Sequence, residues 1–231
     1  MSGTDLLDNP MWHALQGPHR DFARTRGRAA RYDPEVTPFS GVPDDPDPAD
    51  WADLAALFGP DEVAGLAGPA LELPDRWETI FRITGVQMLG PDSVPPAADR
   101  EWIGSALGPD DVEEMLELVA RTRPGPFLPR TVELGGYLGV RSEGRLVAMA
   151  GHRMRLPGFT EVSAVCTDVE ARGRGIAGSL VDQVVAGILA RGERPFLHAT
   201  VENVDAIRLY RSLGFTVRKH IDFAAVRPST G

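Results

Sequence analysis

The chain has 231 residues, 42% of them hydrophobic and 25% charged, so it can form one large domain or two small ones with a packed core. No apolar run approaches the roughly 20 residues that a membrane-spanning helix needs, and residues 1–10 lack the basic-then-apolar pattern of a signal peptide, so we expect a cytoplasmic protein. The net charge is −9 and the acidic excess lies before residue 161, which argues against general nucleic-acid affinity and agrees with a neutral or cationic second substrate.

The first hundred residues contain few regular patterns. In chain order they predict a helix beginning at Asn9, an acidic, proline-rich connector over 38–48, a helix beginning at Asp47, a short helix over 61–66, and strands over 71–73 and 78–89. The prolines within residues 91–99 mark a domain boundary. We therefore divide the chain into an N-terminal region, 1–98, and a domain, 99–231.

Five arginines between residues 20 and 31 could form a basic arm. A solvated helix or loop is the favoured interpretation, because a functional arm would usually belong to a basic domain. Binding of nucleic acid through this arm would depend steeply on salt, which we do not expect.

From residue 100 onward, helix and strand patterns alternate regularly. The predicted elements are a strand over 101–107, a helix from 109, a short helix from 131, strands over 137–141, 145–155 and 160–167, a helix from 176, a strand over 196–200, a helix over 204–213 and a strand over 216–226. This alternation predicts an α/β fold in which a mixed sheet carries helices on both faces.

The loop over residues 172–177 joins an apolar strand to the longest predicted helix. Apolar side chains recur every four positions from Ile176, so one face of that helix is buried. Gly173 and Gly175 carry no side chain that would block a close approach, and the N–H groups at a helix N-terminus attract anions. Two arginines in the loop add positive charge, and the loop therefore predicts a phosphate site.

Residues 173–178 also match the dinucleotide-binding pattern G-x-G-x-x-G. The match is poor, because that fingerprint turns directly from strand into glycine, whereas residues 168–172 intervene here. A P-loop is excluded because neither Gly-Lys-Ser nor Gly-Lys-Thr occurs. The pyrophosphate of coenzyme A is the favoured ligand, while another nucleotide and a purely structural turn remain open.

A second pattern lies over residues 203–215. Ala206, Tyr210 and Gly214 are spaced by four, so they share one side of a helix that Gly214 ends. With the loop, this pattern makes the chain from about residue 100 resemble the GNAT superfamily of N-acetyltransferases. The residues that match the pyrophosphate signature and the late-helix motif of that family are Arg172, Gly175, Ala177, Asn203, Ala206, Tyr210, Gly214 and Phe215.

The resemblance implies a GNAT-like central mixed β-sheet flanked by helices and preceded by a divergent N-terminal region. It also implies an acetyl-CoA site where the strand ending at Thr167 parts from the strand beginning at Phe196. A backbone N–H near Val165 would polarise the thioester carbonyl, which is worth roughly 3 kcal/mol. The implied cofactor-binding residues are Val165, Cys166, Thr167, Arg172, Gly173, Arg174, Gly175, Ile176, Ala177, Gly178, Asn203, Ala206 and Tyr210. Val169 and Ala171 depart from the proline and aromatic that the family often has, which affects loop rigidity more than chemistry.

Acetyl transfer to an amine needs a base for the ammonium and an acid for the departing thiolate. Tyr210 is the candidate acid because family members often use a tyrosine there, although it could simply pack its helix. Glu161 is the candidate base, acting through a water, because strand alternation puts it on one face with Val165. An exposed strand-end carboxylate is the alternative interpretation of Glu161.

Three further side chains have no assigned role in the reaction. Cys166 is predicted to be a small buried residue rather than a nucleophile. His152 and His198 are neighbours only by analogy with the fold and are taken as ordinary polar side chains. No spacing of His, Cys or carboxylate residues suggests a metal.

The favoured function is an N-acetyltransferase that transfers an acetyl group from acetyl-CoA to a primary amine of a small molecule or peptide. A non-catalytic acyl-CoA-binding sensor or scaffold is the alternative. We expect a monomer or homodimer with no nucleic-acid or membrane partner. Residues 1–98 are either a degenerate copy of the same fold or a helical cap over the acceptor pocket.

Overall fold

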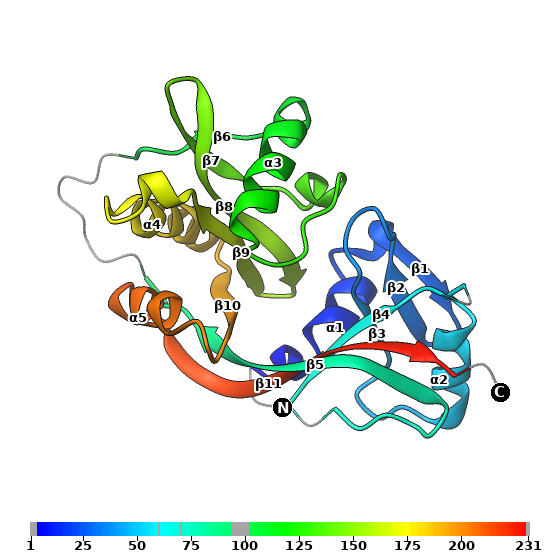
Figure 1. The fold of residues 1–231 in the computed structure, drawn as a ribbon. Coiled ribbons are helices and arrows are strands. Elements are labelled where there is room, and N and C mark those ends of the chain that lie inside the picture. Colours follow the sequence, from blue (N-terminus) through cyan, green and yellow to red (C-terminus); the bar gives the residue numbers. More distant parts are fainter. Residues whose placement is uncertain (1–3, 60, 70, 94–101, 230–231) are drawn as a thin grey trace.

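One mixed sheet of eight strands runs through the protein, in the order β4-β11-β5-β10-β9-β8-β7-β6. The computed structural model describes residues 4–59, 61–69, 71–93 and 102–229. Neighbouring strands are antiparallel except for β9 and β10, which are parallel, so the predicted mixed sheet is confirmed. The long strands β5 and β11 form its curved part (Figure 1). The strands of this sheet are β4 (Ala64–Gly68), β5 (Trp77–Leu89), β6 (Ser105–Ala106), β7 (Leu138–Ser142), β8 (Arg145–Leu156), β9 (Phe159–Thr167), β10 (Arg194–Thr200) and β11 (Thr216–Pro228).

Two helices, α3 (Val112–Thr122) and α4 (Ile176–Ala190), cover opposite faces of β8 and β9. Ala148 of β8 packs in the cluster that contains α4, whereas its neighbour Met149 packs with Met115 of α3. Because successive side chains of a strand point to opposite faces, the two clusters lie on different sides of the sheet. The buried stripe that the four-residue spacing predicted for α4 is confirmed. In the described ranges, no helix is long and apolar enough to cross a membrane.

The N-terminal elements pack against the other end of the sheet, beside β5 and β11 (Figure 1). The carboxylate of Asp47 accepts hydrogen bonds from the N–H groups of Ala49 and Asp50, which confirms the predicted start of α2. Met11 and Leu15 of α1 join a core cluster with residues of β8, β9 and β10. These elements are α1 (Pro10–Gln16), β1 (Ala23–Arg26), β2 (Ala29–Tyr32), β3 (Ser40–Gly41) and α2 (Pro48–Ala55), with short 3-10 helices at Asp5–Asp8 and Arg20–Phe22.

The arginines of residues 20–31 lie mostly on a β-hairpin, so the predicted helix or loop is wrong. Strands β1 and β2 pair antiparallel there. Their ion pairs with acidic residues join Arg24 to Asp33, Arg26 to Asp53, Arg28 to Asp47 and Asp50, and Arg31 to Glu62. The local carboxylates neutralise these cations, which explains why an arginine-rich segment sits in an acidic protein.

Three other predictions need correction. The short helix predicted over 61–66 is wrong, because β4 begins at Ala64 and pairs with β11. Residues 71–73 are not in a strand. Within the described part of residues 101–107, only Ser105–Ala106 is a strand. The short helix predicted from 131 is confirmed as a 3-10 helix, Thr131–Leu134.

Strand β5 comes from the N-terminal region but lies inside the central sheet, between β10 and β11. The residues before the predicted boundary therefore contribute to the same sheet as those after it. Most of the boundary segment 91–99 lies outside the described residues. The division into 1–98 and 99–231 stays a prediction.

Candidate active site

The site begins where two parallel strands separate. In the described chain, β9 and β10 pair at three positions, ending with Glu161 opposite Phe196. Beyond that point a bulge interrupts β9, since Ala164 has a φ of +53° and the register with β8 slips between Ser163 and Cys166. This left-handed conformation costs an alanine about 1–2 kcal/mol, and bulges often lie beside active sites. On the side of β9 that faces β10, the residues after Glu161 therefore have no described partner strand.

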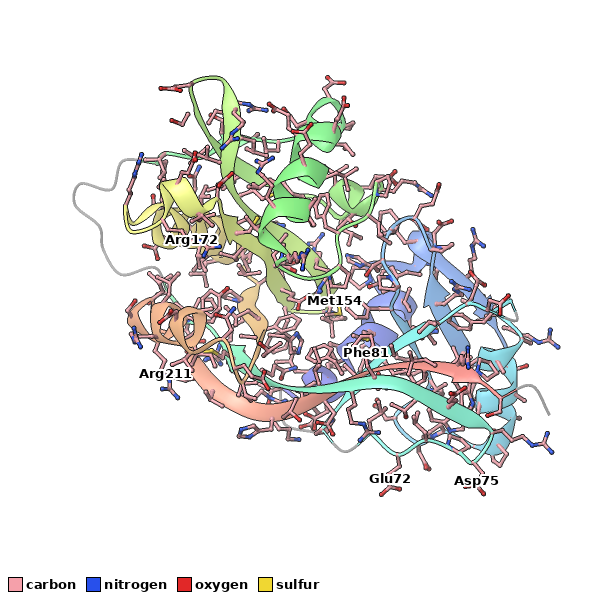
Figure 2. All side chains as sticks on the ribbon, viewed as in Figure 1. Glu72, Asp75, Phe81, Met154, Arg172 and Arg211 are labelled. Carbon is pink, nitrogen blue, oxygen red and sulfur yellow. The ribbon has the colours of Figure 1, made fainter. Side chains whose placement is uncertain are left out.

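This unpaired edge opens into a cleft of about 1030 Å³. In Figure 2, Arg172 lies near α4 and Phe81 near β5, and both line this cleft. Arg174 and Glu161 are the predicted site residues that do not line it, and Arg174 instead donates to the carbonyl of Glu170 at 3.1 Å. The predicted site residues that do line it are Val165, Cys166, Thr167, Arg172, Gly173, Gly175, Ile176, Ala177, Gly178, Asn203, Ala206 and Tyr210.

The loop before α4 presents a row of free backbone N–H groups. Gly173 and Gly175 have φ angles of +76° and +75°, a region that glycine enters without a steric penalty. Within the described chain, the N–H groups of residues 173–178 have no acceptor. The guanidinium of Arg172 donates to the carbonyl of Thr167 at 3.1 Å, which ties the loop to the end of β9. A row of this kind at a helix N-terminus is suited to bind phosphate groups.

Tyr210 reaches the cleft from α5 (Val204–Ser212). Asn203 caps this helix, because its side-chain oxygen accepts from the N–H of Ala206 at 3.2 Å. Tyr210 is 7% exposed, and its ring lies 6.0 Å from that of Phe215. Burial raises the pKa of Tyr210 to about 12, so the hydroxyl keeps its proton at neutral pH. The phenol is therefore a weak acid that can donate a hydrogen bond to an anionic leaving group.

Glu161 lies behind the cleft wall and is fully buried. The alternative interpretation of Glu161 as an exposed carboxylate at a strand end is therefore wrong. It accepts two hydrogen bonds from Arg153, at 2.8 Å to Nε and 2.6 Å to Nη2. The Nδ1 atom of His198 is 2.8 Å from the same carboxylate. Burial alone would raise the pKa of Glu161, but the charge of Arg153 and these hydrogen bonds outweigh it and lower the pKa to about 2. The carboxylate is thus ionised, paired and weakly basic.

A hydrogen-bond network assigns the tautomer of His198. The amide oxygen of Gln87 accepts from Arg218 at 2.9 Å, and its nitrogen donates to the carbonyl of Leu7 at 2.7 Å. The same nitrogen therefore donates its second proton to Nε2 of His198, 3.0 Å away. His198 is then neutral, with its own proton on Nδ1 and donated to Glu161. With both nitrogens engaged and 3% of the side chain exposed, this imidazole is not a free base.

The sequence did not identify Arg153 as a site residue, and it gave His198 no specific role. Both line the cleft, as do apolar side chains from the first hundred residues, among them Phe39 and Phe81. His152 does not line the cleft, and burial, the largest effect, lowers its pKa to about 4. The cleft is therefore built from both predicted regions of the chain.

Cys166 is buried, as expected for a small apolar residue in a strand. Burial raises the pKa of its thiol to about 11, so the thiol is not an activated nucleophile. Among the described residues, no group of three His, Cys, Asp or Glu side chains could hold a metal ion.

Comparison with known proteins places these features in a family context. The family model described as FR47-like protein matches residues 137–224. The crystal structure of a putative acetyltransferase from the GNAT family of Novosphingobium aromaticivorans is 40% identical, with a TM-score of 0.88, over 97% of this chain and 99% of that one.

Two curated relatives match smaller shares of their own length. An uncharacterized protein of Mycobacterium leprae is 30% identical over 204 residues, which are 77% of this chain and 55% of that protein. The N-alpha-acetyltransferase RimI of Mycobacterium tuberculosis is 40% identical over 82 residues, which are 34% of this chain and 51% of that protein. The chain thus spans about half the length of the curated relatives it matches.

Proposed function

Because the chain belongs to the GNAT family of acetyltransferases, we propose that it transfers the acetyl group of acetyl-CoA directly to a primary amine. One observation carries this proposal. A single cleft joins the free N–H row before α4, the unpaired edge of β9 and Tyr210 of α5. The N–H row would bind a diphosphate, and the edge of β9 would pair with an extended arm that contains amides. Tyr210 would donate to a thiolate leaving group.

The described residues fit coenzyme A. A Cβ atom at Gly173 or Gly175 would meet no other atom within 4 Å, so the space beside these glycines is open to a pyrophosphate. The N–H groups of residues 173–178 and the positive end of α4 would hold its charge. The edge of β9 around Val165 and Thr167 would pair with the amides of pantetheine. The thioester supplies an activated acyl group.

In the proposed reaction the neutral amine forms a bond to the acetyl carbon, and the bond from that carbon to sulfur breaks. The N–H of Val165 would donate to the carbonyl oxygen as negative charge develops there, a contribution of roughly 3 kcal/mol. Tyr210 gives its proton to the departing thiolate. The surplus proton on the new amide nitrogen returns through water to the phenolate, which restores the enzyme.

Glu161 was the candidate base from the sequence, but its surroundings favour a positioning role. The carboxylate is fully buried, and Arg153 and His198 occupy its oxygens. A carboxylate with a pKa of about 2 takes a proton from an ammonium group only at a large cost in free energy. We propose that Glu161 holds Arg153 and His198 in the cleft wall, and that the amine enters in its neutral form.

The pH dependence of kcat/KM distinguishes these two roles. If the neutral amine reacts, kcat/KM rises about tenfold per pH unit until the pKa of the acceptor amine, and the inflection moves when an acceptor of different basicity is used. If ionised Glu161 deprotonates a bound ammonium, kcat/KM is flat above about pH 3 and falls beyond the pKa of the amine. We expect the rising profile for two accepted amines of different basicity, measured by thiol release. A flat and then falling profile would restore Glu161 as the base.

Valine at Gly175 should weaken acetyl-CoA binding by at least about tenfold. The φ of +75° disfavours a β-branched residue, and the new side chain would occupy the space beside the N–H row. Gly187→Ala is the matched control, because Gly187 lies in the same helix, is exposed and has open space at its Cβ position. This control should leave acetyl-CoA binding unchanged and raise the free energy of unfolding by about 0.5–1 kcal/mol. Calorimetry with acetyl-CoA measures the binding, and equal affinities in both variants would contradict the phosphate site.

The same calorimetric titration, combined with a screen for thiol release, distinguishes an enzyme from a non-catalytic acyl-CoA sensor. An enzyme binds acetyl-CoA and releases thiol with at least one amine from a screen of amino acids, polyamines, aminoglycosides and peptides. Binding without thiol release from any of them would favour the sensor. Absence of acetyl-CoA binding would remove both functions.

A further inference from the structure

The cleft extends well beyond the residues assigned to acetyl-CoA. Its far part, here called the distal half, is lined by Phe39, Val63, Leu66, Phe81, Ile83 and Phe223. These side chains come from the N-terminal region and from β11, and Figure 2 shows Phe81 well apart from Arg172. None of them was predicted to bind the acyl donor. The distal half is therefore the space left for the acceptor, an inference that rests on the proposed function.

The wall of the distal half is apolar and open. Phe81 is 54% exposed, Ile83 is 41% exposed and Val63 is 37% exposed. Phe81 and Ile83 lie two residues apart on β5 and so share one face, opposite Ala225 and Phe223 of β11. Large apolar side chains that stay exposed along a concave wall mark a place where apolar ligand surface is buried.

The described lining contains the arginines Arg123, Arg153 and Arg172 but only one carboxylate. Asp205, the carboxylate of this lining, lies on α5 at the other end of the cleft and pairs with Arg208. The distal half therefore has no described carboxylate that could bind a cationic acceptor. A polyamine or an aminoglycoside would lose hydration there without gaining a partner for its extra charges.

Arg153 supplies a cation beside this apolar wall. It lines the cleft, and its guanidinium lies 4.9 Å from the ring centre of Phe39. Nε and Nη2 donate to Glu161, which is 1% exposed at its side chain, whereas 11% of the Arg153 side chain is exposed. Within the described chain, Nη1 has no acceptor. The accessible part of this ion pair is thus its positive partner, with donors left for an anionic group.

We propose that the acceptor is an apolar amino acid, which carries an apolar body, the reacting amine and a carboxylate. The apolar body packs on Phe81 and Ile83, and Arg153 binds the carboxylate. Such a molecule is zwitterionic and carries no net charge, which suits an apolar wall with a cation beside it. Arg153 and Phe81 are then the residues that determine acceptor specificity.

Matched acceptors test this assignment. The probes are phenylalanine and 4-(aminomethyl)benzoic acid, their analogues phenylalaninamide and 4-methylbenzylamine, here called uncharged partners because an uncharged group replaces the carboxylate, and spermidine. With kcat/KM calculated from the concentration of neutral amine, we expect the value for at least one acid to exceed that of its uncharged partner by at least about tenfold, the usual effect of a hydrogen bond to a charged group. Spermidine should be the poorest of the five. A preference for spermidine, or uncharged partners that react as well as both acids, would overturn the proposal.

Two variants connect the preference to named residues. Phe81→Ala should raise KM for the preferred acid by about tenfold through lost apolar contact, with KM for acetyl-CoA unchanged. Ile80→Ala is the matched control, because Ile80 is 44% exposed on the same strand but does not line the cleft, and its kinetics should equal those of the parent protein. The double variant Arg153→Met, Glu161→Gln removes both charges together and should reduce the acid-to-uncharged ratio to about one.

Calorimetry on the protein saturated with coenzyme A separates this inference from the proposed function. If no probe is acetylated but the acids bind more tightly than their uncharged partners, the acceptor class holds and the enzymatic function fails. If spermidine is acetylated best, the enzyme stands and the acceptor class fails. If none of the five probes binds or reacts, the proposed acceptor class is rejected.

Discussion

Tyr210→Phe is expected to lower kcat by about 10²- to 10⁴-fold, the range typical for loss of a general acid. The substitution removes one hydroxyl that burial keeps protonated, since the pKa of Tyr210 is raised to about 12. The ring stays packed beside Phe215 at the end of α5. Affinity for acetyl-CoA should therefore remain within about twofold of the parent protein, because nothing in the N–H row changes. Steady-state thiol release measures kcat, and calorimetry measures the affinity.

Tyr137→Phe provides the control for loss of a buried tyrosine hydroxyl. The hydroxyl of Tyr137 is buried without a hydrogen-bond partner in the described chain, and the ring packs edge-on against Phe127. Tyr137 does not line the cleft. Its substitution should leave kcat unchanged and keep or raise the free energy of unfolding, because an unsatisfied buried hydroxyl is unfavourable. A similar loss of kcat in both variants would mean that Tyr210 supports packing rather than proton transfer.

The C-terminal part of the fold was predictable because its patterns are local. The four-residue spacing along α4, the glycines of the loop at 172–177 and the asparagine cap of α5 each act over one or two turns. Such signals specify an element and its end without knowledge of what packs on it. The loop and Tyr210 consequently line the same cleft, as the sequence predicted.

The surroundings of Glu161 depend on strand register, which the sequence does not specify locally. Counting back from the pair of Leu156 and Phe159, an unbroken hairpin would set Arg153 opposite Val162. A register shift between His152 and Arg155 instead brings Arg153 to Glu161. The extra residue lies in β8, so it changes the face on which Arg153 lies and lets Arg153 pair with the buried carboxylate of Glu161.

The N-terminal half was less predictable because its strands are defined by distant partners. Strand β4 is only five residues long and rich in glycine and alanine, and it forms because β11 offers an edge far along the chain. Strand β5 enters the sheet between β10 and β11 for the same reason. Tertiary pairing of this kind outweighs intrinsic preference. The apolar wall with Phe81 could therefore not be assigned to the site from the sequence.

Arg153→Met is expected to lower the free energy of unfolding by about 3–5 kcal/mol, because it leaves the charge of Glu161 buried without its ion-pair partner. At Glu161 the folded-state pKa of about 2 lies below the ordinary value of 4.5, so the pair stabilises the protein above pH 4.5 and this contribution is lost as pH falls towards 2. In the variant the pKa of Glu161 rises, and protonation relieves the unpaired charge. The difference between parent and variant should consequently be largest near pH 7 and smaller at pH 4, as measured by urea unfolding.

Two controls separate an unpaired charge from lost packing. The double variant Arg153→Met, Glu161→Gln has no unpaired charge and should recover most of the stability, since an apolar replacement of a buried pair is often neutral. Arg141→Met breaks a more exposed pair with Asp111 and Glu114 and should change the free energy of unfolding by less than about 1 kcal/mol. If the single and double Arg153 variants were equally unstable, lost packing against Phe39 would be the cause. If both variants were as stable as the parent, the Arg153–Glu161 ion pair would not stabilise the fold. Its only role would then be to bind the acceptor.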